Sequence, residues 1–296
     1  MLRSIVKTIS AMLAGSALLA ACGGGGSAGN TAGNTSGTPT QNSGTNSGAL
    51  VEPVSGSSGS DNSGSQGNAG PSFPTTVISS VFDGTSDSGQ PLTILLQDDG
   101  SYFIVQSDAA TNKPQGVRLG TGVLSSGSFA SSNGLDLSLL GIGIQDAHSL
   151  TLSASYSEKG KFDGSLSYVA DNKTVSFTSN YNNAFETLPN LADFAGVYVG
   201  SIANKDLREE NIVLMISADG KMTGHLICGC AISAQLRVRD DGTAYDATLD
   251  FRQGSSALAG KFFGGNVYLD GTNKRLYIVG KMDGTEDRVI YVGSKI

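Results

Sequence analysis

The chain has 296 residues, a formal net charge of −7 and 3 cysteines. Residues 74–182 hold 5 Lys/Arg against 10 Asp/Glu, and residues 192–296 hold 12 against 13. Because nucleic-acid-binding domains carry a basic patch or stripe, this balance argues against nucleic acid as a partner.

The first 21 residues have the features of a secretory signal peptide. Arg3 and Lys7 precede an apolar stretch over residues 9–19, and small residues precede Cys22. The stretch is far shorter than the roughly 20 apolar residues that a membrane-spanning helix needs. We therefore expect residues 1–21 to be removed on export. An ordinary signal peptide with an incidental cysteine after it is the simpler alternative to a lipoprotein signal.

The segment Leu19-Ala20-Ala21-Cys22 resembles the lipobox of bacterial lipoproteins. The resemblance implies that the Cys22 thiol carries diacylglycerol, with chains such as palmitate, and becomes the mature N-terminus. A cysteine with two or three acyl chains is stably anchored. In enteric lipoproteins Asp after this cysteine favours the inner membrane, whereas Gly23 stands here. The resemblance therefore implies a lipid-anchored protein of the outer membrane.

Residues 22–73 are expected to form a lipidated, disordered tether. From Gly23 to about Ser72 the chain is almost entirely Gly, Ser, Asn and Thr, which cannot bury enough apolar surface to fold. A coil of this length reaches on the order of 40 Å. The run after Cys22 resembles the tether of surface lipoproteins such as transferrin-binding protein B. Similar tethers occur on periplasmic lipoproteins, so both faces of the outer membrane remain open.

From Thr75 onward the sequence is typical of strands. Short runs of Val, Ile, Thr, Tyr and Phe are separated every 8–12 residues by Gly, Asn or Asp. Asp-Gly pairs at 99–100, 219–220, 241–242 and 283–284 indicate hairpin turns. We predict an all-β fold with two small antiparallel barrel or sandwich-like domains. The expected domains are residues 74–182 and 192–296, joined by a linker over residues 183–191.

The two halves contain short matching segments, which suggests duplication. Gly160-Lys161-Phe162-Asp163-Gly164 matches Gly260-Lys261-Phe262-Phe263-Gly264, and Tyr168 and Tyr268 follow at the same distance. Residues 95–100 also resemble residues 215–220, although the two matches differ in spacing by about twenty residues. Chance similarity between glycine-rich strands is the alternative explanation. Each half would hide the edges of its sheet by closing it or by folding it into two layers.

A family resemblance favours barrels. The segment Phe194-Ala195-Gly196-Val197-Tyr198 is similar to the entry of small calycin-like barrels, and residues 260–264 weakly resemble a motif in the barrel domains of transferrin-binding lipoproteins. The long acidic motif that follows in those proteins is absent here. The resemblance therefore implies architecture and location, and it assigns no ligand residues.

The sequence offers few candidates for catalysis. His148 opens an expected strand, and no nearby serine lies in a nucleophile-elbow context. A Ser-His-Asp triad brings together residues that are distant in the sequence, so the sequence alone leaves a hydrolase open as an alternative. The pairs Asp98-Asp99 and Asp240-Asp241 have the residue types of a glycosidase, but each precedes a glycine in an expected turn, where Asp is favoured. No nucleotide-binding motif or EF-hand loop is present. We predict no enzymatic activity and no cofactor.

Cys228 and Cys230 are expected to form a disulfide in the oxidising envelope, with Gly229 supplying the backbone freedom that a short ring needs. Residues i and i+2 of a regular strand point to the same face, but they stand too far apart for a disulfide. Two buried thiols are a second interpretation. A soft metal site made of His225, Cys228 and Cys230 is a third, and we predict no metal.

Taken together, these features favour a binding or adhesion lipoprotein that is exposed on the cell surface as an antigen. Its partners would be the membrane, through the lipid on Cys22, and a protein or small molecule that the sequence does not identify. A structural or assembly lipoprotein that faces the periplasm is the alternative.

The lipid site leads to a direct test. In cells grown on labelled palmitate, the wild-type chain should carry label and a Cys22→Ala variant should carry none. Purification of both chains followed by detection of the label measures this. Equal label in the two proteins would contradict the assignment.

Overall fold

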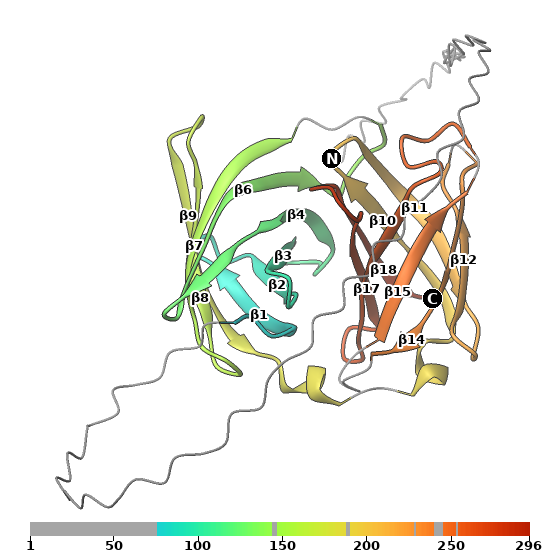
Figure 1. Ribbon diagram of the computed structural model, residues 1–296, viewed down its shortest axis with the longest axis horizontal. Coiled ribbons are helices and arrows are strands. Elements are labelled where there is room, and N and C mark those ends of the chain that lie inside the picture. Colours follow the sequence, from blue (N-terminus) through green and yellow to red (C-terminus); the bar gives the residue numbers. More distant parts are fainter. Residues whose placement is uncertain (1–75, 144–146, 188–189, 228, 240–244, 253) are drawn as a thin grey trace, which may run out of the picture. The chain divides into compact units, whose positions relative to one another are not determined.

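The computed structural model describes residues 76–143, 147–187, 190–227, 229–239, 245–252 and 254–296. The fold is all-β, with two closed eight-stranded antiparallel barrels (Figure 1), and confirms the predicted fold class. Residues 1–75, which include the expected signal peptide, Cys22 and the expected tether, lie outside the described residues, so these assignments stay predictions. No helix in the described part of the chain has the length and apolarity to cross a membrane.

The first barrel is an up-and-down sheet that closes on itself. Its strands are β1 (Ser80–Ser86), β2 (Pro91–Leu96), β3 (Ser101–Ser107), β4 (Pro114–Thr121), β5 (Val123–Ser125), β6 (Ser128–Ser138), β7 (His148–Tyr156), β8 (Phe162–Tyr168) and β9 (Lys173–Tyr181). They follow the order β4-β3-β2-β1-β9-β8-β7-β6, and pairing of β6 with β4 closes the ring. The short β5 continues β4 along β6. A Cβ atom on Gly122, which separates them, would lie 2.3 Å from the Phe129 ring, so only glycine fits.

The second barrel repeats this plan strand for strand. It contains β10 (Gly196–Asn204), β11 (Leu207–Ile216), β12 (Lys221–His225), β13 (Ala231–Gln235), β14 (Arg237–Val238), β15 (Tyr245–Phe251), β16 (Phe262–Asp270), β17 (Arg275–Lys281) and β18 (Arg288–Lys295). The order β13-β12-β11-β10-β18-β17-β16-β15 closes through β13 and β15. Two 3-10 turns, η1 (Asn183–Glu186) and η2 (Leu191–Phe194), connect the barrels.

The shared topology shows which sequence matches are equivalent. Residues 95–100 and 215–220 both form the turn between the second and third strands of a barrel, so this match is in register. Residues 160–164 lead into β8, the eighth strand of the first barrel, whereas residues 260–264 lead into β16, the seventh strand of the second. The Gly-Lys-Phe match is therefore one strand out of register and wrong as an alignment. In both segments the glycine and lysine end a turn and the phenylalanine begins a strand, and a turn of this kind can precede any strand of a barrel.

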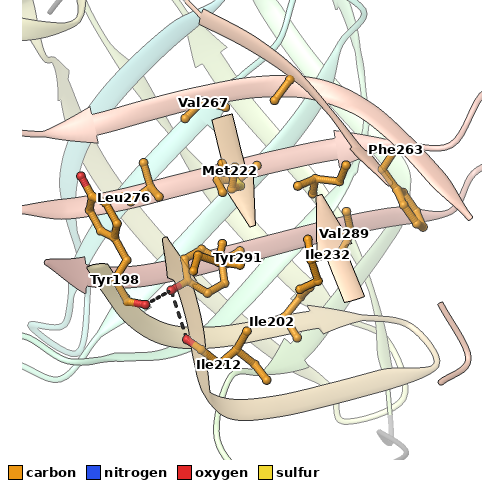
Figure 2. Close-up of a cluster of buried hydrophobic side chains, with 14 of the residues drawn as sticks. Tyr198, Ile202, Ile212, Met222, Ile232, Phe263, Val267, Leu276, Val289 and Tyr291 are labelled. Atoms are coloured by element: carbon orange, nitrogen blue, oxygen red, sulfur yellow. Dashed lines mark hydrogen bonds between the residues drawn. The ribbon is translucent and has the colours of Figure 1, made fainter. Parts of the chain in front are cut away.

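The lumen of each barrel is packed with large apolar side chains. In the first barrel Phe129 and Phe162 meet edge to face with ring centroids 5.3 Å apart. In the second barrel the Tyr291 hydroxyl lies 3.1 Å from the carbonyl oxygen of Tyr198 and 3.3 Å from that of Ile212 (Figure 2). Burial raises the pKa of Tyr291, so this hydroxyl keeps its proton and remains a donor.

A third apolar cluster lies outside both lumens and joins the barrels. It contains Phe103, Val105, Val117, Leu119 and Leu137 of the first barrel together with Ala203, Tyr277, Val279, Ile290 and Val292 of the second. Strands β3, β17 and β18 are consequently buried on both faces along most of their length. Uninterrupted apolar runs such as residues 102–105 and 276–279 are the sequence pattern of strands covered on both sides.

The joint between the barrels affects how the halves behave when separated. Whether residues 74–182 and 192–296 fold independently stays a prediction. Separation would expose this third cluster to water, at a cost of roughly 25 cal/mol for each Å² of apolar surface.

Truncation of the joint should destabilise the protein strongly. Phe103→Ala removes a fully buried ring from the third cluster, and we expect the free energy of unfolding to fall by about 3–5 kcal/mol. The control Val213→Ala alters a side chain that is 43% exposed and should change it by less than about 0.5 kcal/mol. Urea unfolding measures both variants, and equal effects would show that the cluster does not hold the fold together.

Candidate functional site

The register of the first barrel turns a charged pair into its lumen. Arg118 on β4 lies opposite Ile104 on β3 and Asp136 on β6. Its neighbours Val117 and Leu119 belong to the cluster between the barrels. Since successive side chains of a strand point to opposite faces, Arg118 must point into the lumen. The side chains of Arg118 and Asp136 are only 14% and 23% exposed.

A hydrogen-bonded network surrounds this pair. The Arg118 Nε atom lies 3.2 Å from Asp136 Oδ2, and its NH1 group donates to Gln106 Oε1 at 2.6 Å. The Tyr168 hydroxyl donates to the same Asp136 oxygen at 2.6 Å. Burial raises the pKa of Tyr168 to about 12, so the hydroxyl stays protonated at neutral pH. The network is fixed in one arrangement because each member holds the next.

The network lies in a pocket of about 390 Å³. The pocket is lined by Gln106, Gln115, Gly116, Arg118, Asp136, Leu137, Ser138, His148 and Arg208. His148 begins β7, is 63% exposed, and its Nδ1 lies 3.9 Å from Asp171 Oδ2. Barrels of eight strands are just wide enough to be filled by side chains or to hold one small ligand. We call this pocket the polar mouth of the first barrel.

The second barrel offers a comparison within the same chain. The turns Asp99-Gly100 and Asp219-Gly220 align the barrels, so Ile104 corresponds to Gly224. In the first barrel Ile104 pairs with Arg118, which pairs with Asp136. In the second barrel Gly224 pairs with Ile232, which pairs with Phe251, so Ile232 corresponds to Arg118 and Phe251 to Asp136.

The second barrel therefore has an apolar pair where the first has an ion pair. Ile232 and Phe251 are 2% and 0% exposed and belong to the lumen core, in which Figure 2 labels Ile232. A well-packed apolar pair is often at least as stabilising as a buried ion pair. The same topology is therefore built in the second barrel without an ion pair, which makes Arg118 and Asp136 the candidate site residues of the first.

The aspartate pairs that the sequence singled out are structural where they are described. Asp99 accepts hydrogen bonds from the Ser101 amide at 2.8 Å and the Ser101 hydroxyl at 3.0 Å, which confirms its role in the turn. Asp98 forms an ion pair with Arg239 of the second barrel at 2.6 Å, a contact that the sequence did not indicate. Asp240 and Asp241 lie outside the described residues.

The structure places two of the three residues considered as a soft metal site. His225 ends β12 and is exposed, whereas Cys230 is fully buried with its Sγ atom 2.7 Å from the carbonyl oxygen of Arg252. Cys228 lies outside the described residues, so its disulfide with Cys230 stays a prediction. Within the described ranges, no three His, Cys, Asp or Glu side chains are grouped to hold a metal ion.

A larger pocket of about 550 Å³ lies at the joint between the barrels. Its polar side chains are largely engaged with one another. Gln97 donates to Asn266 at 2.5 Å, Asn266 donates to Asp246 at 2.7 Å, and Arg239 pairs with Asp98. This network connects the two barrels, and we assign it a structural role.

The sequence did not identify Arg118, Asp136 or Tyr168 as residues of a site, and Tyr168 was noticed only as part of the repeat. Each of the two charged residues stands between apolar neighbours, as in Val117-Arg118-Leu119, and alternation of this kind normally indicates a solvent-facing charge. The apolar run in β3 is the signal that could have located these residues. A strand that is apolar on both faces has its outer face covered, so charged side chains on the neighbouring strand β4 can point into the lumen.

Comparison with known proteins identifies no family. No family model matches the chain, and no curated protein matches it. A crystal structure of a Bacteroides fragilis protein, which its name provisionally assigns to the outer membrane, aligns with a TM-score of 0.23 and 12% identity. The alignment covers 73% of this chain and 96% of that one. A score this low carries no argument about fold, location or ligand.

The internal comparison yields a prediction for the polar mouth. Arg118→Met leaves the mostly buried Asp136 without its cation, so we expect the free energy of unfolding to fall by about 1–3 kcal/mol. Adding Asp136→Leu should restore most of that loss, because the second barrel is stable with an apolar pair at this position. Urea unfolding of the single and double variants measures the coupling. Losses that simply add would show that the pair does not act as a unit.

Proposed function

We propose that this chain is an outer-membrane lipoprotein, anchored through lipid on Cys22, that binds a small polar ligand in the polar mouth of its first barrel. The observation that carries the proposal is the contrast between the two barrels. Arg118 and Asp136 occupy the position where the second barrel is closed by Ile232 and Phe251. Charged groups are retained in a barrel lumen at a stability cost when they serve a function.

The geometry supports binding rather than catalysis. Asp136 is engaged by both Arg118 and Tyr168, so its carboxylate is held as an acceptor and is not positioned as a general base. The pocket, at about 390 Å³, is near the lower end of the roughly 300–1,000 Å³ range of ligand sites. A few fixed polar groups around a small pocket are what orientation of a small ligand requires.

A structural or assembly role is the second candidate, and a separate surface favours it. Val213 and Met215 on β11 are 43% and 54% exposed, and they pair with Val199 and Val197 on β10. Four apolar side chains therefore lie together on the outer wall of the second barrel. Exposed apolar groups of this kind are typical of contacts with another protein.

Recovery of the bound ligand tests the proposal. The full-length chain carrying Cys22→Ala, which removes the proposed lipid site, is exposed to the small-molecule fraction of a cell-envelope extract and then washed and denatured. Mass spectrometry of the released compounds should show a molecule that is absent from the Arg118→Met/Asp136→Leu variant. Release of the same compounds from both proteins, or of none, would contradict a ligand site in the polar mouth.

A second measurement separates the two faces of the membrane. Protease treatment of intact cells should degrade the wild-type chain if it is exposed on the surface. Survival of the chain in intact cells, with degradation only after the outer membrane is permeabilised, would favour the periplasmic alternative.

A further inference from the structure

Arg208 of the second barrel contributes to the polar mouth of the first. It lies near the start of β11, and its backbone exchanges two hydrogen bonds with Gly143, each 2.9 Å long. Gly143 belongs to the segment that follows β6 of the first barrel. In the same segment, the Gly141 amide donates to the Glu210 carboxylate. These contacts fix the start of β11 beside the pocket, and Arg208 is among the residues that line it.

The glycines of this segment make room for the guanidinium. Gly141 has a φ of +91°, a conformation that side chains rarely adopt, and a Cβ atom there would lie 3.3 Å from Arg208 Nε. Gly143 has a φ of +113°. Both places favour glycine through their backbone conformation, and only at Gly141 would a Cβ atom also press against Arg208.

The charges that line the polar mouth favour an anion. Among the residues that line it, Arg118 and Arg208 face one carboxylate, that of Asp136. This local excess of positive charge occurs in a chain whose net charge is −7. By contrast, the pocket at the joint between the barrels is lined by Arg237, Arg239 and Lys281 against four aspartates.

The two arginines differ in how far they are already engaged. Arg118 is bound by Asp136 and Gln106. The Nε atom of Arg208 is buried and has no hydrogen-bond partner among the described residues. This atom lies against Gly141, so a ligand in the pocket would meet the terminal nitrogens of the guanidinium, which are not among the buried atoms without a partner.

We infer that the polar mouth binds a small molecule through a carboxylate group, with Arg208 as the residue that recognises it. The inference rests on the proposed function and names its ligand class. The planar guanidinium presents a fork of N–H donors that matches the two oxygens of a carboxylate. The site is thus composite, since the first barrel supplies the pocket and the second supplies the anion-binding group.

The test compares probes that match in size and differ in charge. Succinate, succinamide and 1,4-diaminobutane form one series, and benzoate, benzamide and benzylamine form a second. Each is titrated calorimetrically into the full-length chain carrying Cys22→Ala at constant ionic strength. We expect a carboxylate of at least one series to bind at least tenfold more tightly than its amide and its amine.

Two variants identify the residue responsible. Arg208→Gln keeps the backbone bonds to Gly143 and should weaken carboxylate binding at least tenfold. Arg237→Gln is the matched control, because it removes an arginine from the other pocket and should leave binding unchanged. Thermal unfolding of both variants verifies that they are folded.

The outcomes separate this inference from the proposed function. Carboxylate binding that Arg208→Gln leaves unchanged would overturn the role of Arg208. Preference for an amide or an amine, lost in Arg118→Met/Asp136→Leu, would overturn the carboxylate assignment and leave the polar mouth as a ligand site. Failure of every probe to bind would overturn the inference, whereas the proposed function is decided by recovery of its ligand from the extract.

Discussion

The outer walls of the two barrels pack against each other through Phe103, Val117 and Leu119 on one side and Tyr277, Val279 and Ile290 on the other. Once these side chains point outward, strand geometry forces the alternate residues of the same strands into the lumen. That constraint places Arg118 inside the first barrel, and it explains why the polar mouth and the joint between the barrels are two faces of the same strands. The position of the charged pair follows from the apolar contact behind it.

The protein uses one topology twice and gives the two copies different lumens. The nine strands of each copy follow the same order, and the first and second copies share the Asp-Gly turn that leads into their third strand. At the position that closes the lumen, the second barrel has Ile232 against Phe251 and is apolar, whereas the first has Arg118 against Asp136. Both barrels have packed apolar cores, and the first differs in carrying polar groups at this one position.

The joint also explains how one barrel can complete the site of the other. The Gly143–Arg208 bridge and the Asp98–Arg239 ion pair lie at different places along the contact between the barrels. A large buried apolar contact restricts relative motion more than a small polar one would. An arginine from the second barrel can therefore be held beside the pocket of the first with the precision that recognition of a ligand requires.

The sequence by itself determined the all-β class and the Asp-Gly turns at 99–100, 219–220 and 283–284, because these depend on local alternation and turn chemistry. It also contains, at residues 19–22, a segment that resembles a lipobox, and a linear motif of this kind needs no fold to be recognised. Only the tertiary structure decided which face of β4 and β6 points inward. Arg118 and Asp136 each stand between apolar residues, a pattern that places the charged side chain on the solvent-exposed face of an ordinary sheet. Here the second barrel covers the outer face, so the apolar neighbours point outward and the charges point into the lumen. The alignment of the two halves also needed the tertiary structure. The Gly-Lys-Phe segment predicts the start of a strand but not which strand of the barrel begins there.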